Sequence, residues 1–316
     1  MTSWWPAAAL ALVLAGGYAA AWWRRPRTLP AWSPWRIVAW VLGTGLAALA
    51  ISPVLGEGAH HDHRFHMAQH LALGMYAPLA LVLAAPMTLV LGSLPRRAQL
   101  GLTGLLRRRP VQVLTHPASA AVLNIGGMFL LYLTPLYGLS MKYAGAHWLM
   151  LAHFLLAGWL YTWAIAGPDP APGRPRMRTR LSVLIIAAGA HAFLAKLLYA
   201  NAHRFTIHDA HSLHHGVPSL PDDAPSRGTA PSAFPDTLTA TGRASTGDVG
   251  AAIDIGVGPI AQPNTATMET AAQWMYYGGD IAEVVLAIML FTWWLRRRDR
   301  LLRSVRPPRP RPAGRA

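Results

Sequence analysis

The sequence has no cysteine among its 316 residues. Disulfide bonds and thiolate metal sites are therefore excluded, and a metal in this protein must be held by histidine, methionine or carboxylate side chains. Charged residues are also scarce, because they make up only 13% of the chain. We find no nucleophile motif and no phosphate-binding loop, so the chain is predicted not to be an enzyme.

Apolar residues, in contrast, make up 53% of the chain, and 13 residues are tryptophan. This composition is more apolar than that of soluble domains and favours a membrane protein. Lysines and arginines outnumber acidic residues by 28 to 13. The arginines lie in short clusters between apolar stretches, however, and no nucleic-acid-binding motif accompanies them. We therefore expect the lipid bilayer, and no nucleic acid, as a partner.

Seven stretches approach the length of about 20 apolar residues that crosses a bilayer as a helix. The charges of the first stretch follow its apolar core, which favours a membrane helix over a signal peptide. Gly74, Pro78 and Pro86 predict a kink in the third stretch. The fold class predicted is an all-α polytopic membrane protein with about seven transmembrane helices, at residues 4–23, 32–55, 67–91, 118–136, 147–166, 181–201 and 271–295.

Arginine clusters follow the first, third, fifth and seventh stretches, whereas the other loops hold few basic residues. Basic residues accumulate in cytoplasmic loops, so this pattern predicts an N-terminus outside and a C-terminus in the cytoplasm. The predicted parts are a first transmembrane helix with its basic loop (1–30), helices two to six with outer-face histidines (31–215), a flexible outer loop (216–266), the seventh helix (267–299) and a basic, proline-rich cytoplasmic tail (300–316).

Histidines gather at the predicted outer face, and five of the fourteen lie in the stretch HHDHRFHMAQH at 60–70. His66 and His70 are four residues apart, which places both on one face of a helix, next to Met67. Paired imidazoles with methionine and without cysteine favour copper, although zinc also accepts histidines. The candidate metal ligands are His66, Met67, His70, His147, His153 and His191. We expect the loop histidines His60, His61, His63, His214 and His215 to be solvated.

Other polar groups lie within the apolar stretches, where ionisable side chains are costly and usually functional. Lys196 belongs to the sixth stretch, and Asp280 and Glu283 belong to the seventh. Lys196 can neutralise one of these carboxylates in an ion pair between the two helices, or all three can take part in the site. In both cases the sixth and seventh helices are predicted to touch at this depth.

Five blocks of the chain, taken in order, resemble the membrane-integral cytochrome c oxidase assembly factor family of the CtaG type, the seven-helix family and not the cysteine-bearing copper chaperone. The resemblance covers about residues 35–300 apart from the loop at 216–264. HMxxH before a proline-containing apolar helix, followed by the HFLxAG block, is its most specific feature. The blocks are HMAQHLALGMYAPLALVLAAP, THPASA, HWLMLAHFLLAGWLYTWAIAGPDPAP, HAFLAKLLYA and QWMYYGGDIAEVVLAIMLFTWW.

The resemblance implies a multi-pass protein of the bacterial plasma (inner) membrane that helps to mature a haem-copper oxidase by handling copper at the outer face. The implied partners are an oxidase subunit or a periplasmic copper carrier. One departure is that Thr267, Met268 and Glu269 stand where the family often has Asp-Gln-Gln. The matching positions are His66, Met67, His70, His116, Pro117, His147, His153 and His191.

Two other functions remain open from the sequence. Facing histidines on neighbouring helices can ligate haem iron, so His70, His153 and His191 also fit a haem-binding or quinone-linked redox protein. A metal transporter is the other alternative, with Lys196, Asp280 and Glu283 as its coupling path.

Overall fold

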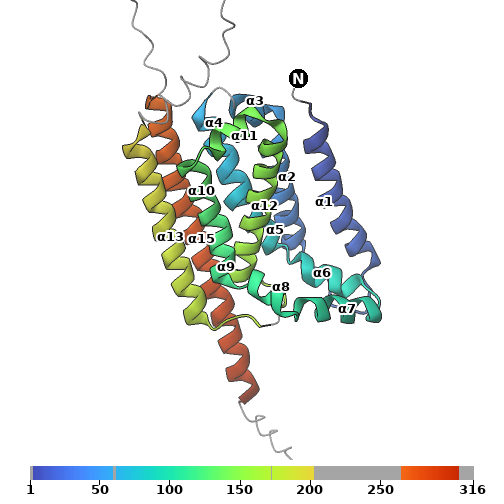
Figure 1. Cartoon of the computed structure of the whole chain (residues 1–316). Coiled ribbons are helices and arrows are strands. Elements are labelled where there is room, and N and C mark those ends of the chain that lie inside the picture. Colours follow the sequence, from blue (N-terminus) through green and yellow to red (C-terminus); the bar gives the residue numbers. More distant parts are fainter. Residues whose placement is uncertain (1–2, 60–61, 172, 203–264, 306–316) are drawn as a thin grey trace, which may run out of the picture. The chain divides into compact units, whose positions relative to one another are not determined.

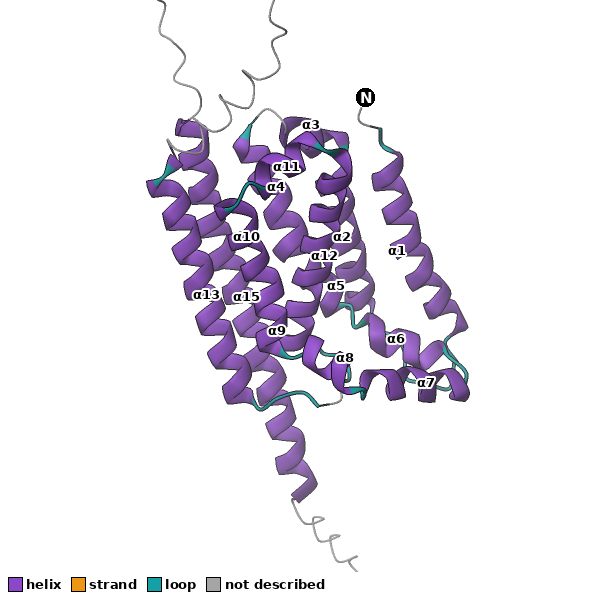
Figure 2. Cartoon of the chain, in the orientation of Figure 1, coloured by secondary structure: helices purple, strands orange, loops and turns teal. Residues whose placement is uncertain are grey.

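The computed structural model describes residues 3–59, 62–171, 173–202 and 265–305. Within these ranges every regular element is a helix (Figure 2). Residues 216–264 of the predicted outer loop, the histidines His60, His61, His214 and His215, and residues 306–316 of the proline-rich tail lie outside the described residues. What the sequence suggests about these parts therefore stays a prediction. His63, predicted to be a solvated loop residue, instead begins a helix and is half-buried.

Several described helices are long and apolar enough to cross a membrane (Figure 1). A pair bent by 45°, His63–Leu83 and Pro86–Ser93, adds a sixth span if it counts as one, and the apolar segment Pro117–Leu133 is shorter. A multi-pass all-helical membrane protein is thus confirmed, whereas the count of seven and the orientation of the termini stay predictions. The five long spans are α1 (Trp5–Arg24), α2 (Pro34–Ile51), α12 (Ala144–Ala166), α13 (Met177–Ala200) and the part Thr265–Asp299 of α15 (Thr265–Val305).

Shorter helices connect these spans and form two of the predicted segments. The third predicted segment contains a π-helix, η1 (Ala72–Tyr76), and the fourth contains a second one, η2 (Val122–Gly126). The remaining helices are α3 (Pro53–Ala59), α4 (His63–Leu71), α5 (Ala77–Leu83), α6 (Pro86–Ser93), α7 (Arg96–Leu106), α8 (Arg109–Leu114), α9 (Pro117–Ala121), α10 (Gly127–Leu133) and α11 (Leu136–Lys142).

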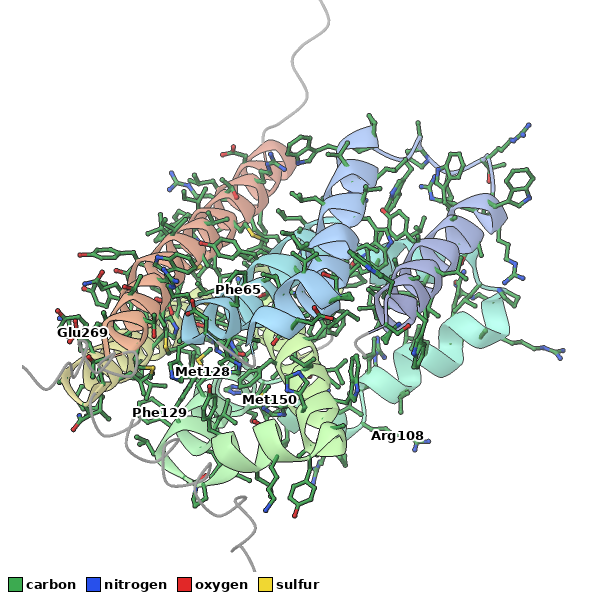
Figure 3. All side chains as sticks on the ribbon, turned by 90° about the horizontal axis from the view of Figure 1, so that it is seen from above. Phe65, Arg108, Met128, Phe129, Met150 and Glu269 are labelled. Carbon is green, nitrogen blue, oxygen red and sulfur yellow. The ribbon has the colours of Figure 1, made fainter. Side chains whose placement is uncertain are left out.

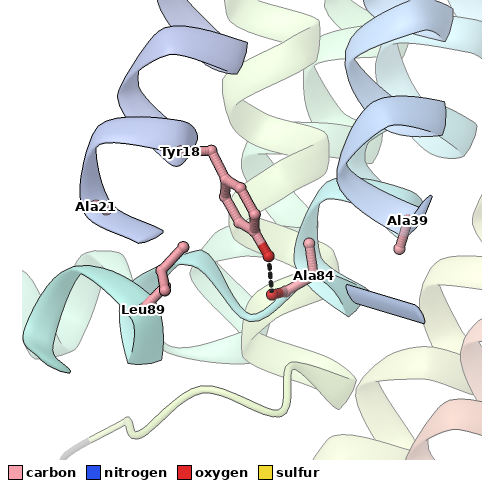
Figure 4. Packing of buried hydrophobic residues seen from close by; sticks show 5 residues of the cluster. All are labelled: Tyr18, Ala21, Ala39, Ala84 and Leu89. Atoms are coloured by element: carbon pink, nitrogen blue, oxygen red, sulfur yellow. Dashed lines mark hydrogen bonds between the residues drawn. The ribbon is translucent and has the colours of Figure 1, made fainter. Parts of the chain in front are cut away.

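The kink predicted in the third segment is confirmed at the junction of α5 and α6. Ala85 has a φ of 53°, a left-handed conformation that is unfavourable for a residue with a Cβ, and Pro86 then starts the new helix. Tyr18 of α1 holds this junction, because its hydroxyl donates a hydrogen bond of 3.1 Å to the carbonyl of Ala84 (Figure 4). The bend is therefore stabilised by a contact from a different helix.

Glycines allow several spans to approach closely, as is common where membrane helices pack. A Cβ at Gly158 of α12 would overlap the carbonyl of Gly74 in η1, and a Cβ at Gly43 of α2 would lie 2.8 Å from Leu81. Pro78 lacks the N–H that would otherwise bond this Gly74 carbonyl. The helices α13 and α15 form the most extensive pair, which confirms the predicted contact between the sixth and seventh segments.

Candidate functional site

The helix α4 carries the two histidines that the sequence pairs. Asp62 caps its start, since one carboxylate oxygen accepts a 2.8 Å hydrogen bond from the backbone N–H of Arg64. The side-chain amide of Gln69 donates to the carbonyl of Ala50 at 2.7 Å and so ties α4 to α2. With α4 held in this way, the His66 and His70 side chains point into the protein and are only 3% and 4% exposed.

Aromatic rings enclose both imidazoles. His66 meets the edge of Tyr137 at 5.1 Å between ring centroids, and His70 meets Phe154 at 4.3 Å in the same manner. Tyr132 of α10 lies 6.3 Å from each of the two histidine rings. The two tyrosines were not among the residues that sequence reasoning selected, because a tyrosine near the end of an apolar helix ordinarily indicates the membrane interface.

His191 and Glu283 approach the same region from α13 and α15. The Nδ1 atom of His191 lies 3.8 Å from Oε1 of Glu283, and His191 is completely buried. A Cβ at Gly279 would overlap this imidazole, so the glycine makes room for it on α15. His70 is close enough to His191 for their charges to interact. We refer to His66, His70, Tyr132, His191 and Glu283 as the histidine cluster.

Much of the hydrogen-bonding capacity of the histidine cluster is not used within the protein. The buried atoms without a hydrogen-bond partner include Nε2 of His70, both ring nitrogens of His191, Oε1 of Glu283 and the hydroxyl of Tyr132. Most buried polar atoms in proteins are hydrogen-bonded, so a group of such atoms on converging helices requires a reason. Their donor chemistry, imidazole nitrogen beside carboxylate and phenol oxygen, suits a metal ion.

The other predicted ligands lie apart from this cluster. The Nε2 atom of His153 is 3.1 Å from the carbonyl oxygen of Leu123 in η2, and its ring packs against Gly127. His147 is half-buried with its ring beside Trp148. His116 caps α9, because its Nδ1 accepts a 3.2 Å hydrogen bond from the N–H of Ala118.

The supporting groups on the last two spans are also separated. Lys196 is exposed, and its ammonium group lies 5.3 Å from the ring centroid of Tyr276. The side chain beside Glu283 is therefore that of His191 and not that of Lys196. The sequence had suggested an ion pair between Lys196 and a carboxylate of the last span. Asp280 is close enough to Glu283 for their charges to interact. Glu269 lies on the first turns of α15, at the edge of the bundle (Figure 3).

Each π-helix adjoins one of the predicted ligand histidines. The helix η1 begins directly after α4, and η2 holds Asn124, whose side-chain amide is buried without a hydrogen-bond partner. The widened turn of η2 presents the Leu123 carbonyl that His153 contacts. Single π-turns inside α-helices often occur at functional sites, because they re-aim side chains and free backbone carbonyls.

The described residues contain no group of three or more histidine, aspartate or glutamate side chains arranged to hold one metal ion. A closed structural metal site normally has four ligands arranged around one ion, so the described residues hold no preformed site of that kind.

Mycobacterial proteins are similar to part of this chain. Uncharacterised proteins of Mycobacterium bovis and Mycobacterium tuberculosis are each 38% identical to the chain over 194 residues, and one of Mycobacterium leprae is 36% identical over the same length. Each match covers 58% of this chain and 29% of the relative, so the chain spans less than a third of the length of these relatives. No solved structure matches the chain.

One protein family matches nearly the whole chain. Its description is cytochrome c oxidase caa3 assembly factor, and the match runs over residues 16–297. This range includes all of the histidine cluster and all of the described spans except the first turns of α1 and the end of α15. The chain therefore belongs to the cytochrome c oxidase caa3 assembly factor family.

Proposed function

We propose that this protein binds a copper ion transiently at the histidine cluster and passes it to a caa3-type oxidase during assembly. The observation that carries the proposal is the pair of buried imidazoles, His70 and His191, whose charges interact and whose ring nitrogens include atoms with no hydrogen-bond partner. The family supplies the oxidase as the partner.

The chemistry of the residues agrees with copper as the cargo. Imidazole nitrogens bind copper well, and the thioether of a methionine such as Met67, next to His66, favours its reduced form. Glu283 lies beside Nδ1 of His191 at 3.8 Å, where a carboxylate can orient the imidazole and strengthen its other nitrogen as a donor. His70 and His191 are therefore the proposed ligands, and Glu283 is a positioning residue.

The small number of proposed copper ligands supports a role in transferring copper to another protein, and not in storing it. Two imidazoles hold a metal less firmly than a closed four-ligand site does, and they leave positions for ligands of a donor or an acceptor protein. A protein that transfers a metal ion needs such open positions, because a ligand of the acceptor protein must bind the metal before the bond between the metal and the imidazole breaks.

A row of histidines leads from the start of α4 to the proposed ligands. His63, His66 and His70 are spaced by three and four residues and follow one stripe of the helix. Tyr137 adjoins the first two, because its hydroxyl lies 3.3 Å from Nδ1 of His63 and its ring packs against His66. We propose that copper enters along this stripe.

The test is the copper content of detergent-purified full-length protein, measured by mass spectrometry. We expect the double variant His66→Ala/His70→Ala to lose copper and the matched control His147→Ala, which removes a half-buried histidine outside the cluster, to keep it. Wild-type copper stoichiometry in the double variant would contradict the proposal. An absorption spectrum of the same samples tests the haem alternative, which requires a Soret band that depends on His70.

A second experiment tests delivery. A strain without this protein, complemented with the wild type or with His191→Ala, is assayed for copper in the purified caa3-type oxidase. We expect copper-deficient oxidase with His191→Ala at normal levels of the assembly factor. Fully metallated oxidase in that strain would leave the family role in place and exclude the histidine cluster as its copper site.

A further inference from the structure

A cavity of about 540 Å³ lies away from the histidine cluster, between the end of α5, the start of the α12–α13 loop and the last turns of α15. Its apolar lining residues include Leu83, Ala166 and Met289. Trp293 and the charged residue Arg296 of α15 also line it, so the lining is amphipathic.

Arginines surround the indole ring of Trp293. The guanidinium carbon of Arg180 lies 4.2 Å from the ring centroid, and those of Arg297 and Arg174 lie at 5.4 and 5.8 Å. Arg180 is only 1% exposed and donates a 2.9 Å hydrogen bond to the carbonyl of Ile165, while its buried Nε has no hydrogen-bond partner. A buried arginine with an unused donor is unusual and favours an anion nearby.

The carboxylates near this site do not balance its positive charge. Asp169 receives hydrogen bonds from the backbone N–H groups of Met87 and Thr88, and burial raises its pKa. Asp299 is the acidic residue that lines the cavity. Burial lowers the pKa of the Arg174 guanidinium to about 10, so this side chain stays protonated at neutral pH. Arg174, Arg180 and Arg297, which surround Trp293, therefore outnumber the two carboxylates.

We propose that this cavity is a binding site for an anionic phospholipid. The phosphate group would sit at the rim with Arg296 and the arginines around Trp293, and an acyl chain would lie along Leu83 and Met289. The neighbouring surface of α15 is apolar and accessible to lipid, since Ile288 is 57% exposed and Phe291 is 43% exposed. Basic pockets between membrane helices commonly bind anionic head groups, and the arginine pattern predicts this end to be cytoplasmic, where anionic lipids are abundant.

The test compares three probes on the full-length protein in detergent: phosphatidylglycerol, phosphatidylcholine and inorganic phosphate. We expect native mass spectrometry to show retained phosphatidylglycerol, and thermal unfolding to shift upward by several degrees with this lipid alone. Equal binding of phosphatidylcholine would overturn the proposal, because the arginines would then be irrelevant. An equal shift with phosphate alone would also overturn it, because it would assign the site to a free anion.

Two variants locate the binding. Arg296→Gln should weaken phosphatidylglycerol binding about 5-fold, the effect of one arginine beside an anionic head group. Thr292→Trp should abolish binding by filling the cavity, which Thr292 lines. Arg298→Gln is the matched control, because Arg298 is exposed and lies over Trp294 at 5.7 Å. The same loss in Arg298→Gln as in Arg296→Gln would refute a defined site and indicate general surface charge.

Discussion

Two groups of polar residues occupy different parts of the bundle and differ in how many of their hydrogen-bonding atoms have partners. Arg174 and Asp169, in the loop after α12, use most of their hydrogen-bonding groups: the two terminal nitrogens of Arg174 donate to the carbonyls of Gly167, Trp163 and Asp169, and its Nε alone has no partner. In the histidine cluster, by contrast, His70, His191 and Glu283 keep ring nitrogens and a carboxylate oxygen without partners. Asp169 is buried like His70 and His191, so burial alone does not separate polar groups that have partners from those that do not.

The difference indicates what each group contributes. A hydrogen bond to a charged group stabilises a protein by about 1.5–3 kcal/mol, whereas a buried polar atom without a partner costs about 1–3 kcal/mol. The arginine and aspartate of the loop therefore stabilise the fold. The unpaired atoms of the histidine cluster cost free energy in the metal-free protein, and the proposed copper binding would offset this cost.

The largest effect should follow from His191→Ala. Removing one of the two proposed ligands should weaken copper binding about 100-fold, equivalent to about 2.7 kcal/mol, while the stability of the metal-free protein changes little. A copper titration monitored by competition with a chelator, together with thermal unfolding without metal, measures both. If His191→Ala binds copper as tightly as the wild type, the histidine cluster would not differ from the Arg174 and Asp169 loop in binding a ligand.

The reverse behaviour is expected for Asp169→Ala. This change leaves the N–H groups of Met87 and Thr88 at the start of α6 without their acceptor and should cost about 2 kcal/mol of stability. Copper binding should not change. Asp169→Asn is the control, because its amide oxygen can still accept from Thr88 and should retain part of the stability in thermal unfolding. Loss of copper in Asp169→Ala would mean that the two regions are coupled.

A smaller effect is expected from a variant that tests whether the position of the His191 ring matters for copper binding. Gly279→Ala introduces a Cβ that would overlap the His191 ring, so the imidazole must move and copper affinity should fall about 10-fold. Gly189→Ala on α13 is the control, because a Cβ there has no neighbour within 4 Å. If both variants bind copper equally well, the position of His191 is not important for binding.

The smallest effect concerns the start of α4, which carries His66 and His70. Asp62→Ala removes the cap and should cost about 1 kcal/mol. The hydrogen bonds from Arg64 lower the pKa of Asp62, so its contribution is present above the ordinary aspartate pKa and is lost as pH falls through the lower, folded value. Thermal unfolding of wild type and variant should therefore differ at pH 7 and converge in acid, and a constant difference would contradict this assignment.

Several features of the fold and site were predictable because they depend on local sequence. The lengths of the apolar stretches anticipate α1, α2, α12, α13 and α15. Pro78 and Pro86 anticipate the bend, since proline cannot continue the hydrogen bonding of a helix. The four-residue spacing of His66 and His70 predicts that they share one face of α4, because residues four apart lie on the same side of an α-helix.

Other features were not predictable, because they depend on which helices meet. Nothing in the local pattern separates His191, which lies beside Glu283, from His153, which contacts the Leu123 carbonyl. The positions of Tyr132 and Tyr137 beside the histidines also follow from packing between helices. The two π-helices have no simple sequence signature, although η1 lies within a block that resembles the family.

The sequence by itself determined the class of this protein: apolar stretches long enough to cross a membrane, no cysteine to bind metal, and blocks that identify the family. Only the tertiary structure decided which of the histidines belong to the histidine cluster at which we propose copper binding. The reason is physical, since helix periodicity is set by neighbours in sequence, whereas contacts between helices depend on where the backbones can approach. At Gly279 the absence of a single Cβ leaves the space that His191 occupies.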